Sequence, residues 1–151
     1  MTYNLDSFSK ANDAPMIKIR ILNIEISFHI FFSVNCWEIM CDRHQQGDDY
    51  RTAFTKAVFQ MYRLTAEKSA KVLKEDDFVG LSDKILRSIL NEILKQDKKV
   101  QSEYHSIQTE DVYERFYQAN ETIMKNLKLG VFYLLERALK KSLVPITGII
   151  E

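Results

Sequence analysis

The residues most suited to holding a metal ion gather in one short stretch of the chain. Cys36, Cys41 and His44 follow one another at spacings of five and three residues. Zinc prefers thiolate and imidazole ligands, but it needs three or four of them, and structural sites usually combine two close pairs. The second pair is missing here, and only His105 offers a distant fourth ligand. We therefore expect no metal and no cofactor, and these three residues are the candidates for a metal-dependent enzyme if that expectation fails.

A nucleophile paired with a base is the next chemistry to consider. Ser27 and His29 lie two residues apart on a predicted strand, so their side chains point the same way at about 6–7 Å, too far for a hydrogen bond. The sequence also contains no Walker loop, GxGxxG, GxSxG or HExxH motif. The pattern favours a protein without catalytic activity.

Adjacent aspartates occur twice, at Asp48 and Asp49 and again at Asp76 and Asp77. Paired carboxylates can bind Mg²⁺ or share a proton in acid–base catalysis. Neighbours in sequence seldom converge on one point, however, and both pairs fall where predicted helices begin or end. Helix capping accounts for them without a catalytic role.

The clearest structural signal is a hairpin over residues 16–33. Six apolar residues alternate with polar ones on either side of Leu22 and Asn23, and the phase changes between the two halves: Ile17, Ile19, Ile21, Ile24, Ile26 and Phe28. A two-residue turn explains that change, because it brings all six to one buried face and sets Arg20 opposite Glu25. Leucine seldom adopts the positive φ of a type I′ turn, so a longer loop or a bulge stays open.

Apolar residues at helical spacing predict three long helices after the hairpin, at about 50–74, 83–97 and 109–142. Ser82 and Thr109 are suitable N-caps for the second and third helix. The second helix carries apolar residues in two adjacent rows, more than one contact face needs.

The remaining segments show no such period. Residues 1–15 are predicted to be a polar tail, and 33–47 and 96–108 to be connections between the regular elements. The predicted fold is α+β, an N-terminal antiparallel β-hairpin packed on a bundle of about three long α-helices. Residues 16–151 are expected to form a single domain of this kind.

Composition narrows the classes of function. The chain has 151 residues, of which 46% are hydrophobic and 28% charged, and its formal net charge is zero. A neutral chain does not carry the strongly basic surface typical of nucleic-acid-binding proteins. Two cysteines close in sequence form no disulfide framework, and no apolar run is long enough to span a membrane. These features predict a cytoplasmic protein without specific nucleic-acid binding.

Aromatic residues along the third predicted helix keep one alternative open. Tyr113, Phe116 and Tyr117 could stack on bases if basic residues stood beside them, but Glu110 and Glu114 lie there instead. Packing in a core or against a partner is the favoured interpretation. A nucleic-acid-associated regulator is the alternative.

Surplus apolar surface favours binding to another protein. We predict a regulator or inhibitor that acts by binding a protein partner. We also predict that this chain forms a homodimer, with the second strand and the second helix as the interface. The residues assigned to this interface are Ile30, Phe32, Leu86, Leu90 and Leu94. An exposed row of this kind would form the contiguous apolar patch that usually marks an interaction site.

Overall fold

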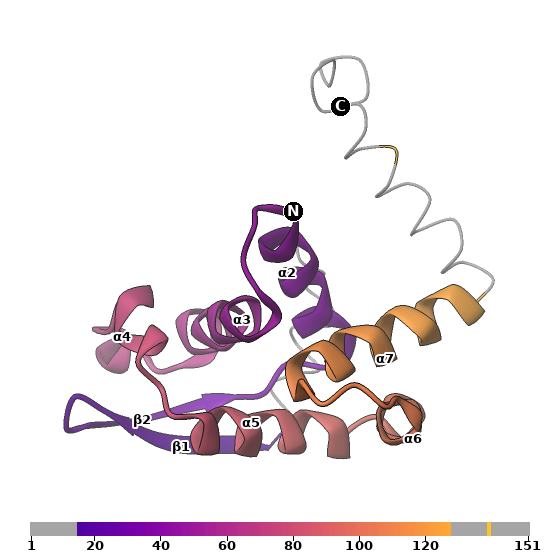
Figure 1. The fold of residues 1–151 in the computed structure, drawn as a ribbon. Coiled ribbons are helices and arrows are strands. Elements are labelled where there is room, and N and C mark those ends of the chain that lie inside the picture. Colours follow the sequence, from indigo (N-terminus) through magenta and orange to yellow (C-terminus); the bar gives the residue numbers. More distant parts are fainter. Residues whose placement is uncertain (1–14, 128–138, 140–151) are drawn as a thin grey trace.

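A computed structural model of the chain describes residues 15–127 and 139, and Figure 1 shows its fold. The elements in chain order are β1 (Met16–Ile21), β2 (Ile24–His29), α2 (Ser33–Gln45), α3 (Tyr50–Thr65), the 3-10 helix η1 (Lys68–Ala70), α4 (Glu75–Val79), α5 (Asp83–Lys95), α6 (Lys98–Ser106) and α7 (Val112–Asn126). The α+β class and the N-terminal antiparallel hairpin are confirmed. The prediction of about three long helices is wrong, since the described residues contain six α-helices.

The hairpin has the predicted register, with Ile21 opposite Ile24 and Arg20 opposite Glu25. Its turn consists of two residues, Leu22 at φ 52° and Asn23 at φ 65°. Positive φ at both positions is what a type I′ turn requires, and for leucine it costs on the order of 1–3 kcal/mol. The burial of one strand face outweighs that cost, because a slip by one residue would turn every apolar side chain to the other face.

The first predicted helix, 50–74, ends nine residues early. Asp49 caps its start as α3, but Ala66 has an extended backbone and the helix stops at Thr65. The Tyr62 hydroxyl then holds the returning chain, since it donates to the carbonyl of Ala70 and accepts the amide of Leu73. These bonds between side chain and backbone replace the helical ones over the segment where the apolar stripe thins.

Residues 33–47, predicted to be a connection, form the helix α2 instead. The sequence gives little sign of it, because Phe32 at its N-cap position makes no side-chain capping bond. Packing provides the reason for this helix. Cys36, Trp37 and Met40 are fully buried, and α2 lies against α3 and α7.

Two further helices occupy segments that showed no apolar stripe. Within 96–108, α6 begins after Asp97, whose carboxylate accepts the amide protons of Lys99 and Val100. The short helix α4 begins after Lys74, whose amide donates to Asp77 at 2.7 Å. Caps of this kind stabilise helices too short to form on their own.

The other two predicted helices are found with different bounds. α5 ends two residues before the predicted 97, and Ser82 caps its start, with its hydroxyl oxygen accepting the amide of Ile85 at 3.3 Å. The helix predicted at 109–142 begins later, with Asp111 rather than Thr109 as its cap, and α7 ends at Asn126. Of the rest of that prediction only residues 127 and 139 are described, and of the predicted tail over 1–15 only Pro15 is described.

The core lies where α3 packs on β2 and meets α2, α4 and α7. Its largest aromatic side chains are fully buried: Phe28, Trp37, Phe54, Tyr62, Phe78 and Phe116. α5 lies on the β1 side of the hairpin, and the turn of the hairpin projects beyond it (Figure 1). Ile24, next to that turn, is therefore 38% exposed although Ile26 on the same strand face is buried. None of the helices within residues 15–127 is both long and apolar enough to cross a bilayer.

Candidate interaction groove

The three candidate metal ligands lie on α2 and serve its packing. Cys36 and Cys41 are buried, and desolvation raises the pKa of the Cys36 thiol far above its ordinary value. The His44 ring stacks on Tyr50 with ring centroids 4.3 Å apart, and its Nδ1 lies 3.0 Å from the carbonyl oxygen of Asp48. Over residues 15–127, no three His, Cys, Asp or Glu side chains are placed to hold a metal ion. That the protein binds no metal ion stays a prediction.

The paired carboxylates have separate local partners. Asp48 forms an ion pair with Lys56 at 2.7 Å. Asp49 accepts the amide of Thr52 at 2.7 Å as the cap of α3, and this hydrogen bond lowers the pKa of its carboxyl group. Asp77 binds the backbone at the start of α4. Asp49 and Asp77 therefore bind backbone amides at helix ends, and Asp48 binds a neighbouring lysine.

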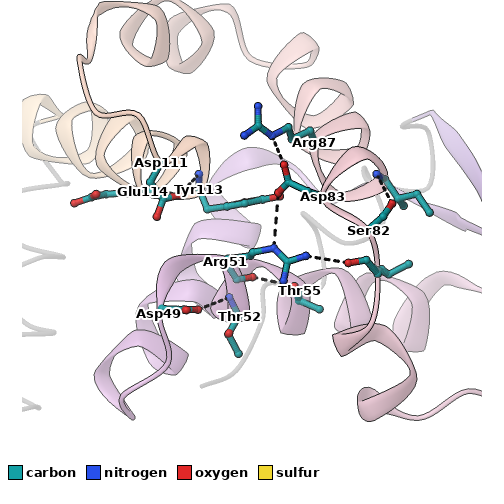
Figure 2. Close-up of polar contacts among 12 residues, drawn as sticks. Asp49, Arg51, Thr52, Thr55, Ser82, Asp83, Arg87, Asp111, Tyr113 and Glu114 are labelled. Carbon is teal, nitrogen blue, oxygen red and sulfur yellow. Dashed lines mark hydrogen bonds and ion pairs between the residues drawn. The ribbon is translucent and has the colours of Figure 1, made fainter.

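A polar network around Asp83 joins three helices (Figure 2). The Asp83 carboxylate accepts a hydrogen bond from the Tyr113 hydroxyl and forms ion pairs with Arg87 at 2.6 Å and Arg51 at 3.7 Å. Arg51 also donates to the carbonyl of Leu81 at 2.9 Å. The network ties α5 to α3 and α7. Sequence reasoning missed it, since Asp83 lies 30 residues from Tyr113 and the pairing has no local signature.

Four of the five residues assigned to a partner interface lie in the interior of the single chain: Ile30, Leu86, Leu90 and Leu94 are all at most 2% exposed. Phe32, at the N-cap of α2, is half-buried. Both apolar rows of α5 thus pack against the chain's own elements, and no exposed row is left on that helix. Of these four, Leu94 also lies in the lining of the groove described below, and their place in a partner interface stays a prediction. The homodimer itself stays a prediction.

A groove of about 1130 Å³ runs between β1 and α5. One wall consists of five consecutive residues, 16–20, and the other comes from α5, with His105 of α6 also in the lining. Successive side chains of a strand point to opposite faces of the sheet. A groove that touches all five residues therefore runs along the outer edge of β1.

Within residues 15–127, no strand lies beside the outer edge of β1. The amide of Ile30 donates to the carbonyl of Pro15 at 3.3 Å, which makes these two residues a hydrogen-bonded pair of the antiparallel ladder. Because such pairs alternate, the N–H and C=O groups of Met16, Lys18 and Arg20 point away from β2. No residue of the described chain forms a backbone hydrogen bond to these groups. The edge is therefore open to another strand.

The opposite edge of the hairpin is covered at its His29 end. The amide of His29 in β2 donates to the hydroxyl of Thr65 in α3 at 3.0 Å. α3 also contacts β2, so a strand could not pair with His29 without displacing the end of that helix. Within the described residues, α3 thus occupies one end of the β2 edge, whereas the β1 edge is open and borders the groove.

The groove combines apolar and basic side chains. Ile17, Ile19 and Ile85 line it and are half-buried. Its charged side chains are four basic ones and one acidic one: Lys18, Arg20, Lys84, Lys95 and Glu92.

Two of the basic side chains have acidic partners already. Arg20 lies 4.0 Å from Glu25, and Lys95 lies 2.8 Å from Glu92. Lys18 and Lys84 have no ion pair with any residue that the structure describes. A chain of zero net charge thus carries a local positive excess along this groove.

Comparison with known proteins finds no match: no family model, no curated protein and no solved structure matches the chain. The functional proposal therefore rests on the geometry of the groove. The alternating isoleucines predict a hairpin with open strand edges. The sequence gives no sign of which strand edge lies against a helix. It also does not indicate which residues of α5 face the open edge, since both depend on how α3 and α5 pack.

Proposed function

We propose that this protein is a cytoplasmic regulator or inhibitor without catalytic activity. It binds an extended segment of another protein along β1. The observation that carries the proposal is the open edge of β1 beside an apolar groove. A peptide that adds a strand to an open sheet edge gains affinity from main-chain hydrogen bonds and specificity from pockets for alternate side chains.

The size of the edge suits a short segment. Residues 16–20 span about 13 Å as a strand, so a partner segment of about five residues would pair along the whole groove. A third strand would also stabilise the hairpin, because two strands alone are marginal in water. The bound segment would lie against Ile17, Ile19 and Ile85, which are half-buried in the free chain.

A second copy of this chain is a poorer occupant of the same edge. Symmetric antiparallel pairing of two β1 strands centred on Lys18 sets that lysine opposite its own copy, and pairing centred on Ile19 sets it opposite Arg20. Like charges directly opposite each other destabilise a sheet. Basic residues on an edge strand also oppose edge-to-edge aggregation. We therefore place a different protein, rather than a second copy, on β1.

Hydrogen exchange on the full chain tests strand addition. Peptides selected from an unbiased displayed library of unstructured sequences should protect the backbone amides of Lys18 and Arg20 when they bind. Replacing Lys18 by proline removes one outward-facing N–H and leaves the bonds to β2 in place, so it should abolish this binding. Lys18→Ala, which keeps the amide, is the matched control and should retain most of it.

Two results would overturn the proposal. One is that the selected peptides protect another surface and leave both amides unchanged. The other is that the library yields no peptide that binds this chain better than an unrelated hairpin protein of similar size.

A further inference from the structure

We infer that the β1 groove selects an acidic partner segment, a strand in which carboxylate side chains alternate with apolar ones. This inference rests on the proposed function and adds the chemistry of the partner. The first argument is charge. The lining has four basic side chains and one acidic one, and two of the basic ones, Lys18 and Lys84, have no acidic partner in the described chain. An incoming carboxylate would supply that partner.

The second argument is the alternation of faces along a strand. A strand added beside β1 turns its side chains alternately to the two faces of the sheet. On one face its neighbours are Ile17 and Ile19, with Ile85 reaching in from α5. On the other face its cross-strand neighbours are Lys18 and Arg20. The groove therefore matches a segment with Asp or Glu at every second position and aliphatic residues between them.

A nucleic acid is the other polyanion to consider, and the lining argues against it. Single-stranded nucleic acids bind with their bases stacked on aromatic side chains. No residue of the groove lining is Phe, Tyr or Trp. The outward N–H and C=O groups of β1 repeat at the spacing of a peptide backbone, and a phosphodiester chain has no donors to pair with those carbonyls.

Three synthetic peptides of seven residues test the inference. Each has valine at positions 2, 4 and 6, and either glutamate, glutamine or lysine at the other four positions. Fluorescence anisotropy of the labelled peptides with the full chain measures their affinities. We expect the affinity of the glutamate peptide to be at least about ten times that of the glutamine peptide, and the lysine peptide to bind weakest. Raising the salt concentration should reduce that preference.

Charge reversal in the protein should reverse the order of the peptides. In the double variant Lys18→Glu, Lys84→Glu the lysine peptide should bind best. The matched control is Lys68→Glu, Lys71→Glu, which makes the same change of charge at two exposed lysines outside the groove and should keep the original order. Lys18→Gln, Lys84→Gln is the milder second variant and should bind the glutamate and glutamine peptides about equally. Circular dichroism establishes that each variant is folded.

The outcomes separate the inference from the function beneath it. If glutamate and glutamine peptides bind equally and both protect the amides of Lys18 and Arg20, the acidic preference is wrong and strand addition survives. If no peptide protects those amides, strand addition fails as well. If a single-stranded oligothymidylate binds the groove more tightly than the glutamate peptide and loses affinity in the charge-reversed variant, the occupant is a nucleic acid and the inference is overturned.

Discussion

The hydroxyl of Tyr113 donates a hydrogen bond to the carboxylate of Asp83, thirty residues away along the chain. This bond joins the first turn of α7 to the first turn of α5 (Figure 2). The Tyr113 ring also packs against Phe54 of α3, with ring centroids 5.5 Å apart. Because Lys84 and Ile85 follow Asp83 directly, the pair helps to position the α5 wall of the groove.

Removing that hydroxyl should weaken the fold modestly. Tyr113→Phe keeps the buried ring and deletes the hydrogen bond, so we expect a loss of about 0.5–1.5 kcal/mol in the free energy of unfolding, measured in urea. Tyr104→Phe is the control, since no residue of the described chain makes a hydrogen bond with that hydroxyl. An equal loss in both variants would contradict the role assigned to the bond.

The same bond predicts how stability depends on acidity. The hydrogen bond from Tyr113, aided by Arg87 and Arg51, lowers the pKa of Asp83 below its ordinary 3.8. A carboxyl group with a lower pKa in the folded state stabilises the fold above pH 3.8 and loses this effect as the pH falls through its folded pKa. Since the side chain is 48% exposed, the contribution should stay below about 1 kcal/mol.

Asp83→Asn tests this sign. The variant should be less stable than the wild type near neutral pH, and the difference should shrink as the pH falls below about 4. Chemical denaturation at several pH values measures it. A difference that grows in acid would mean that the carboxylate destabilises the folded state.

Two isoleucines on the same face of β2 differ in how deeply they are buried. Ile26 is 1% exposed and Ile24 is 38% exposed, although both lie on the strand face that the sequence predicts to be buried. Ile26→Ala should lower the free energy of unfolding by about 2–5 kcal/mol, and Ile24→Ala by less than about 1 kcal/mol. Equal effects of the two substitutions on the urea midpoint would show that the hairpin turn is covered in solution.

A charge on α5 tests whether its second apolar row is core or interface. Leu90 is 1% exposed, so Leu90→Glu should unfold the chain, because it buries a carboxylate without a partner. Val72→Glu, at a position 62% exposed, is the control and should stay folded. Circular dichroism and sedimentation velocity at micromolar concentration measure folding and association together. A folded Leu90→Glu monomer beside a dimeric wild type would return Leu90 to the interface of a homodimer.

The residue pattern by itself determined the hairpin and α5. Alternation of six apolar residues around Leu22 and Asn23 leaves only one register that puts them all on one face, and this holds even though the turn takes an unfavourable leucine. Ser82 followed by an apolar stripe likewise marks the start of α5. Both signals are local, because strand and helix periods are written into neighbouring residues.

Only the tertiary structure decided which surfaces remain free. α2 forms because Trp37 and its neighbours are buried against α3 and α7, and its sequence has neither a cap nor a clear stripe. Leu86 and Leu90 fill two rows that the sequence treats as surplus, and the packed chain buries both. Thr65 covers the β2 edge at His29, and the β1 edge borders the groove beside Lys18 and Lys84. Such choices depend on contacts between residues far apart in the chain, and no local period records them.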